Sequence, residues 1–133
     1  MQNSLQKPIS TKLVRNHRLD ELNLCEVAYA PMLVQARHTH KYASFSFVLN
    51  GSYAESVRRR TYARQASTLI FHPPEESHAV EFQTNVRILS VEFSFERLAK
   101  IRRHSVIFED LASCRTEKTN FLVLKIYREF CLM

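Results

Sequence analysis

Three histidines are spaced so that they can meet in one binding site. His38 and His40 are separated by one residue, and residues i and i+2 of an extended strand project from the same face. His78 follows several further strand-like segments and the turn at Pro73-Pro74. Two histidines on one strand and a third on a later strand predict a group of ligands in the mouth of a small β-barrel.

Three neutral imidazoles can hold Zn²⁺, Fe²⁺, Mn²⁺ or Ni²⁺ with positions left open for a substrate. The alternative is that His38, His40 and His78 line a polar pocket, or form hydrogen bonds at its rim, without a metal. No catalytic triad, glycine-rich phosphate loop or paired carboxylates stand out, so we assign no catalytic residue. A divalent metal is the one cofactor that this residue set suggests.

The segment from Ser44 to Leu49 alternates strictly between an aromatic or aliphatic face, formed by residues 45, 47 and 49, and a face of small side chains, formed by residues 44, 46 and 48. The first of these faces, the aromatic side, needs a cover, which can be a second sheet, a helix or a partner subunit. Residues 38, 40, 44, 46 and 48 share the other, cavity-facing side if no bulge intervenes. The same parity applies after the proline turn. The residues predicted to bind a ligand are His38, His40, Ser44, Ser46, His78 and Val80.

Further short segments separated by turns predict a mainly β fold, either a barrel or a sandwich. The only glycine, Gly51, follows Asn50, and this pair predicts a type I′ hairpin. We predict a lead-in with one edge strand over residues 1–21, a β-barrel over 22–95 and a helical segment over 96–133. Ser94 is expected to cap the first helix, and either Thr116 or Thr119 the second.

The second helix, over residues 116–130, carries an apolar stripe that can face the barrel or a second subunit. The residues predicted for dimerisation are Leu122, Val123, Ile126, Tyr127 and Phe130. The helical pattern is still apolar at Met133, and we therefore expect this chain to be the front part of a longer, truncated protein.

Composition and charge restrict the class of protein. The chain has 133 residues with 45% hydrophobic content, which suits one globular domain. Its net charge of +6 is spread along the chain, and the run Arg58-Arg59-Arg60 is predicted to be a solvated hairpin end rather than a DNA-binding patch. Three unpatterned cysteines and the lack of a long apolar run predict a cytoplasmic protein that does not cross a membrane.

Two motifs resemble those of the cupin family. His38-Thr39-His40, Ser44 and Gly51 follow the spacing of the first cupin motif, and Pro73 to His78 follows the second. Ser44 stands where the motif has a glutamate ligand. Ser67 and Glu75 stand where it has glycines, and Phe82 stands where it has an asparagine. Without the carboxylate, a site would lose one negative charge, and hard metals should suffer most.

The amino-acid sequence of residues 45–55, 67–78 and 91–93 resembles that of the N-terminal sensor domain of AraC-type bacterial transcription regulators. The resemblance covers roughly residues 22–133. It implies a cupin-type double-stranded β-helix, a jelly-roll barrel followed by C-terminal α-helices. It further implies a small-molecule effector and a homodimer. DNA binding is expected only through the helix-turn-helix part of such regulators, and no segment of this chain resembles that part.

Sensors of this type generally work without a catalytic metal, so the resemblance implies a chain that has no cofactor and is not an enzyme. Two alternatives stay open. The chain can be a free-standing metal-dependent cupin enzyme, of the dioxygenase or isomerase type, that uses His38, His40 and His78. It can also be a structural dimerisation module with a filled barrel.

Overall fold

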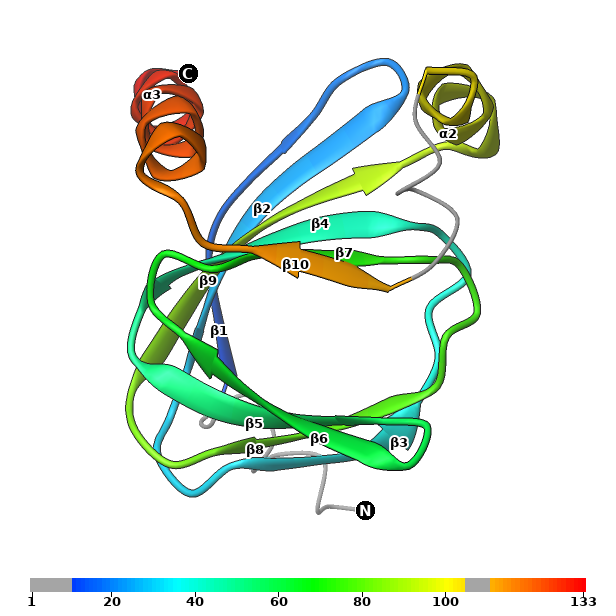
Figure 1. The fold of residues 1–133 in the computed structure, drawn as a ribbon. Coiled ribbons are helices and arrows are strands. Elements are labelled where there is room, and N and C mark those ends of the chain that lie inside the picture. Colours follow the sequence, from blue (N-terminus) through cyan, green and yellow to red (C-terminus); the bar gives the residue numbers. More distant parts are fainter. Residues whose placement is uncertain (1–10, 105–110) are drawn as a thin grey trace, which may run out of the picture.

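Two antiparallel β-sheets face each other in the computed structural model, which describes residues 11–104 and 111–133 (Figure 1). The larger sheet has the order β1-β2-β9-β4-β7-β10 and the smaller one β3-β8-β5-β6. The larger sheet consists of β1 (Thr11–Arg18), β2 (Leu22–Tyr29), β9 (Val86–Phe93), β4 (Ser44–Asn50), β7 (Leu69–His72) and β10 (Ala112–Cys114). The smaller sheet consists of β3 (Val34–His38), β8 (His78–Phe82), β5 (Ser52–Val57) and β6 (Arg60–Gln65). The chain passes repeatedly between the sheets, which confirms the predicted cupin-type jelly roll.

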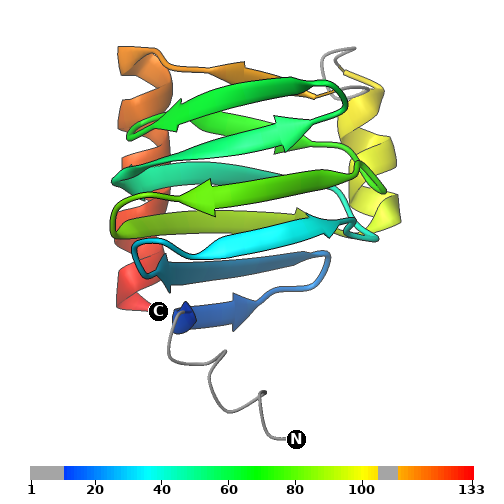
Figure 2. The same cartoon turned by 90° about the horizontal axis from the view of Figure 1, so that it is seen from below.

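Two helices cover the outer face of the larger sheet, near opposite ends of its strands (Figures 1 and 2). Helix α3 (Glu117–Leu132) packs Phe130 against Phe47 and other apolar residues of this face. Helix α2 (Phe95–Arg102) packs Leu98 against Phe93 in the same way. The aromatic side of the Ser44–Leu49 segment is thus covered by helices, one of the three predicted solutions.

The first helix is capped by the predicted Ser94, and the second by Thr116, one of the two predicted candidates. The Ser94 hydroxyl accepts a hydrogen bond of 3.1 Å from the backbone N–H of Arg97. The Thr116 hydroxyl accepts one of 3.1 Å from the N–H of Thr119. Each cap satisfies a backbone donor that has no partner within the helix. None of the helices described in the structure is long and apolar enough to cross a membrane.

The prediction of a type I′ hairpin at Asn50-Gly51 is wrong. β4 pairs with β7 and β9, whereas β5 pairs with β6 and β8, so this turn is a corner between the sheets. A type I′ turn needs positive φ at both central residues, and only Gly51 has it, with φ of +85°. A Cβ on Gly51 would lie 2.2 Å from the carbonyl oxygen of Asn85. The glycine therefore serves a close approach of two corners.

The true hairpin of this region lies at the arginine run. Val57 of β5 pairs with Arg60 of β6, and Arg58 in the turn has a φ of +57°. Arg58, Arg59 and Arg60 are exposed, which confirms the predicted solvated hairpin end.

Two predicted boundaries differ from the structure. The lead-in over residues 1–21 contains β1, which runs along β2 as the predicted edge strand, while residues 1–10 lie outside the described part. The helical segment over 96–133 contains β10, which pairs with β7. Its three residues are too few to show an alternating pattern. The boundary at residue 95 therefore does not separate barrel from helices.

Candidate functional site

A cavity of about 250 Å³ lies between the two sheets. Its wall includes all six residues that the sequence predicted for ligand binding, namely His38, His40, Ser44, Ser46, His78 and Val80. They do not lie on one continuous strand, however. β3 ends at His38 in the smaller sheet, and β4 begins at Ser44 in the larger one. The predicted single strand face is therefore formed by two strands in different sheets, and the chain crosses from one sheet to the other between His38 and Ser44.

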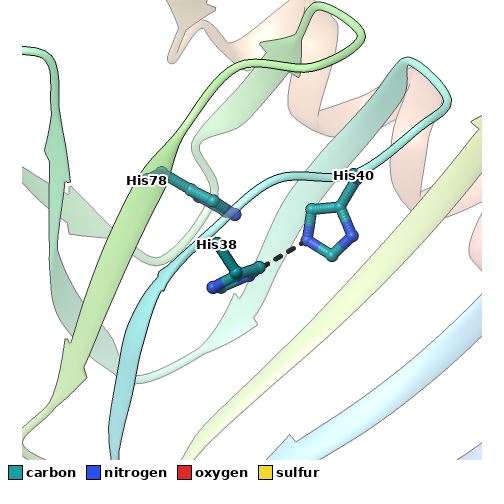
Figure 3. A group of neighbouring side chains, drawn as sticks. All are labelled: His38, His40 and His78. Carbon is teal, nitrogen blue, oxygen red and sulfur yellow. Dashed lines mark hydrogen bonds between the residues drawn. The ribbon is translucent and has the colours of Figure 1, made fainter.

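The three predicted imidazoles converge in this wall (Figure 3). His38 ends β3 and is the register partner of His78, the first residue of β8, and their ring centroids are 4.4 Å apart. His40 lies in the loop after β3, and its Nε2 is 3.1 Å from Nε2 of His38. One ring nitrogen from each histidine lies within 4.8 Å of the other two. The histidines are therefore placed to share one ligand.

Hydrogen bonds orient two of these rings. Nδ1 of His38 lies 2.7 Å from the carbonyl oxygen of Ala36, which can only accept, so Nδ1 carries the proton. Nδ1 of His78 donates to Oε2 of Glu55 at 2.6 Å. In the neutral rings, Nε2 of both histidines then has no proton and carries a lone pair. Nε2 of His78 is buried and has no hydrogen-bond partner in the described structure.

The loop position of His40 is held from a neighbouring turn. The backbone N–H of Glu75 donates to the carbonyl of His40 at 2.8 Å. Glu75 has a φ of +64° and Ser67 one of +70°, at the two positions where the cupin motif has glycines. Glycine adopts this region without strain, whereas other residues pay about 1–2 kcal/mol there. Partial burial, together with the charges that His38 and His78 can carry, lowers the pKa of His40 and favours its neutral form.

A buried carboxylate, Glu55, organises the cavity wall behind His78. Its Oε2 accepts hydrogen bonds from Nδ1 of His78 and, at 2.7 Å, from Nε2 of His72. Its Oε1 accepts one of 2.8 Å from the guanidinium of Arg64, which is equally buried. Burial opposes ionisation of Glu55, but the hydrogen bonds from the two histidines and the charge of Arg64 outweigh it and lower its pKa far below the usual value.

Glu55 and His72 were not among the site residues predicted from the sequence. Glu55 alternates with Tyr53 and Val57, which are both buried, and this parity was the available signal. Glu55, His72 and His78 also form a second group of potential metal ligands. Their contacts are already satisfied as hydrogen bonds, so the cluster is complete without an ion.

The cavity side of the larger sheet is layered from polar to apolar. Each layer is a row of register partners on neighbouring strands. The first row consists of Asn23, Glu92, Ser44 and His72. The second row consists of Cys25, Ser90, Ser46 and Ile70. The third row contains Val27, Ile88 and Val48. A ligand here would meet polar groups at one end and aliphatic side chains at the other.

The outer side of the same strands is tied to α3 through another buried carboxylate. Glu26 is fully buried, and its Oε1 accepts hydrogen bonds of 3.0 Å from Tyr127 and from Arg15. Arg87 forms an ion pair with its other oxygen at 3.2 Å. Burial and hydrogen bonding with Cys131 and Glu26 raise the pKa of Tyr127 to about 12.

The five residues predicted for dimerisation divide between two faces of α3. Val123, Tyr127 and Phe130 pack against the larger sheet. Leu122 and Ile126 are each about half exposed, at 50% and 51%. Only the latter two are placed to contact a second subunit.

Residues 24–118 match the family model described as AraC-like ligand binding domain. No curated protein sequence matches the chain significantly. Among solved structures, the chain is similar to a cupin superfamily protein from Desulfitobacterium hafniense DCB-2, with 10% identity, a TM-score of 0.58, and coverage of 63% of this chain and 77% of that one. It is similar to the Cnp3 cupin domain of Schizosaccharomyces pombe, with 13% identity, a TM-score of 0.58, and coverage of 72% and 73%.

A third similar structure is oxalate decarboxylase from Bacillus subtilis, described with Mn(II) centres. Identity is 17% and the TM-score is 0.50, over 56% of this chain and 22% of that one. At these identities, the solved structures establish the shared fold.

Proposed function

Because this chain belongs to the family of AraC-like ligand binding domains, we propose that it is the effector-sensing part of an AraC-type transcription regulator. The observation that carries the proposal is the polar cavity with three converging imidazoles inside the matched region. The effector would be a small molecule, because the cavity measures about 250 Å³. DNA would be bound by a part of the regulator other than this domain.

The cavity and the covering helix share the same strands, which offers a path for the signal. β2 presents Cys25 and Val27 to the cavity and Glu26 to Tyr127 of α3. If the effector binds more tightly to one arrangement of β2, it would therefore favour the position of α3 that goes with that arrangement. This coupling is part of the proposal.

The histidine cluster fits a divalent metal, and we propose that one is bound there together with the effector. Nε2 of His78 is a buried atom that has no hydrogen-bond partner in the described part of the chain. The orientation of the His78 ring by Glu55 follows the carboxylate–histidine arrangement of metal sites. His38, His40 and His78 would hold the ion. A bound ion would act as a Lewis acid toward an anionic oxygen of the effector. With Ser44 in place of a carboxylate, nitrogen-preferring ions such as Zn²⁺ or Ni²⁺ suit the set best.

Metal titration tests this site directly. The protein is stripped with EDTA and titrated with Zn²⁺ by isothermal calorimetry, with the melting temperature as a second readout. We expect one ion per chain and a higher melting temperature in the wild type. His40→Ala should weaken binding at least 10-fold, while His104→Ala, an exposed histidine outside the cavity, should leave it unchanged. Equal binding by the two variants would refute the site.

The second candidate function is a free-standing metal-dependent cupin enzyme. The observation that favours it is the same: three histidines in a cavity leave coordination positions open for a substrate. Product analysis separates the candidates. A compound that stabilises the metal-loaded domain should be recovered unchanged after prolonged incubation if the domain is a sensor, and converted if it is an enzyme.

A homodimer through α3 is also part of the proposal. Leu122 and Ile126 lie one turn apart, and with Phe121, which is 63% exposed, they leave an apolar surface on the helix. Light scattering should show a dimer that is lost in the double variant Leu122→Glu/Ile126→Glu. Val34→Glu changes an exposed apolar residue of the smaller sheet and serves as the control. A monomeric wild type at high concentration would contradict this interface.

A further inference from the structure

Two acceptors on the larger sheet, at the polar end of the cavity, have no hydrogen-bond partner among residues 11–104 and 111–133. Asn23 of β2 and Glu92 of β9 are register partners and face the cavity together. Oδ1 of Asn23 is buried and accepts no hydrogen bond from the described residues. Glu92 is half-buried, and it forms no hydrogen bond or ion pair within the described part of the chain. A buried acceptor without a donor is unfavourable, so this pair is suited to a donor from outside the protein.

The charges around the pair favour a cationic donor. Asn23 and Glu92 also line an adjoining depression, whose charged residues are Arg18, Asp20, Glu21 and Glu96. Of these, Glu21 is paired with Arg97 and Lys100. Together with Glu92 itself, the carboxylates of Asp20 and Glu96 and the guanidinium of Arg18 therefore remain near the amide. A carboxylate forms its strongest hydrogen bonds with a charged donor, and an ammonium group supplies three.

Aromatic rings border the same place. Tyr42 and Phe95 line the depression, with ring centroids 4.9 Å apart, and Phe95 is 49% exposed although it is apolar. Aromatic faces attract cations. Nζ of Lys41 already lies 5.5 Å from the ring centroid of Tyr42, so the exposed ring of Phe95 is the one that adds to the preference for an ammonium group over a neutral hydroxyl.

The opposite wall of the cavity has a complementary preference. The three histidines offer imidazole nitrogens and, under the proposed function, a divalent cation, and both suit an anionic oxygen. Ser44 lies between the two regions, because it is the register partner of Glu92 on one side and of His72 on the other. The ring centroid of His72 in turn lies 5.4 Å from that of His78, a member of the histidine cluster. The cavity thus has a cation-preferring end and an anion-preferring end.

We propose that Asn23 and Glu92 form a subsite for the ammonium group of the effector, and that the effector is a small amino carboxylate. The inference rests on the proposed function for its second half only: the carboxylate would lie toward the histidines, while the ammonium group lies between Asn23 and Glu92.

Matched pairs of probes test the subsite. β-Alanine, 4-aminobutanoate and 5-aminopentanoate are each compared with the carboxylate of equal length that lacks the amine, with and without Zn²⁺. Affinity is measured by isothermal calorimetry. For at least one length we expect the amino compound to bind about 10-fold more tightly than its partner, as a charge-assisted hydrogen bond allows. Glu92→Gln should abolish this preference. Glu81→Gln, which changes an exposed glutamate outside the cavity wall, should retain it.

A second variant protects the test against a folding defect. Asn23→Asp adds a negative charge to the subsite, which attracts an ammonium group and repels a carboxylate, and should therefore widen the difference in affinity between the amino compounds and their amine-free partners. Equal binding of amino and amine-free compounds, binding of none of the three amino compounds, or a preference that survives Glu92→Gln would overturn the inference. If zinc does not bind but the amine preference is present, the proposed metal site fails while the subsite stands.

Discussion

Replacement of Glu55 by glutamine should be strongly destabilising, because Glu55 is the only carboxylate among the described residues that pairs with the buried guanidinium of Arg64. Arg64 is 4% exposed, and the Glu55 carboxylate that it contacts is 1% exposed. Removing one partner of a buried ion pair costs about 3–5 kcal/mol, because the other charge stays buried and uncompensated. For a chain of this size, that corresponds to a fall in melting temperature of roughly 10–20 °C. The glutamine amide would also direct N–H groups toward the donors of Arg64, His72 or His78.

A double-mutant cycle measures this cost in EDTA-treated protein. Urea unfolding is followed by circular dichroism for Glu55→Gln, Arg64→Met and the double variant. The double variant should recover part of the loss, because no buried charge is left alone. Glu76→Gln breaks the Arg58–Glu76 pair, in which Arg58 is 61% exposed, and should cost less than about 1 kcal/mol. A loss below 1 kcal/mol for Glu55→Gln, or strictly additive effects, would refute the reasoning.

Three further outcomes are expected. Burial raises the pKa of Tyr29 to about 12, so the stability that its neutral form contributes is complete below pH 10 and is lost as the pH rises toward 12. In urea unfolding across that pH range, the free energy of unfolding of Tyr29→Phe should therefore fall by about 2–3 kcal/mol less than that of the wild type. Tyr127→Phe removes the 3.0 Å hydrogen bond to the buried carboxylate of Glu26 and should cost about 1.5–3 kcal/mol, with faster amide hydrogen exchange in α3; unchanged exchange would contradict the tie. Gly51→Ala should lower stability by about 2–5 kcal/mol in thermal unfolding, since a Cβ meets the Asn85 carbonyl at 2.2 Å and φ is +85°; a neutral effect would show that the corner can relax.

Strand parity was the part of the sequence that predicted the site best. Alternation along Ser44–Leu49 separated cavity from helix-facing residues correctly, because side chains of a strand point alternately to its two faces whatever the partner strand is. The helix caps were also predictable, since a cap depends on residues within one turn.

Properties that depend on partner strands were not predictable in this way. Asn50-Gly51 has the local chemistry of a hairpin, yet its two strands pair elsewhere, and the need for glycine comes from Asn85 in another corner. Glu55 is a charged residue in a short strand, and its burial depends on Arg64 and His72 being brought to it.

By itself, the sequence determined the mainly β architecture and the two faces of the central strand, because these follow from local periodicity. The spacing of the two motifs indicated which histidines would meet, although His40 lies in the loop after β3 and not on the strand. Only the tertiary structure decided which polar groups are buried together and which are left without partners. Burial and pairing depend on contacts between residues far apart in the chain. For that reason the Glu55 network and the Asn23–Glu92 subsite emerged only when both sheets were in place.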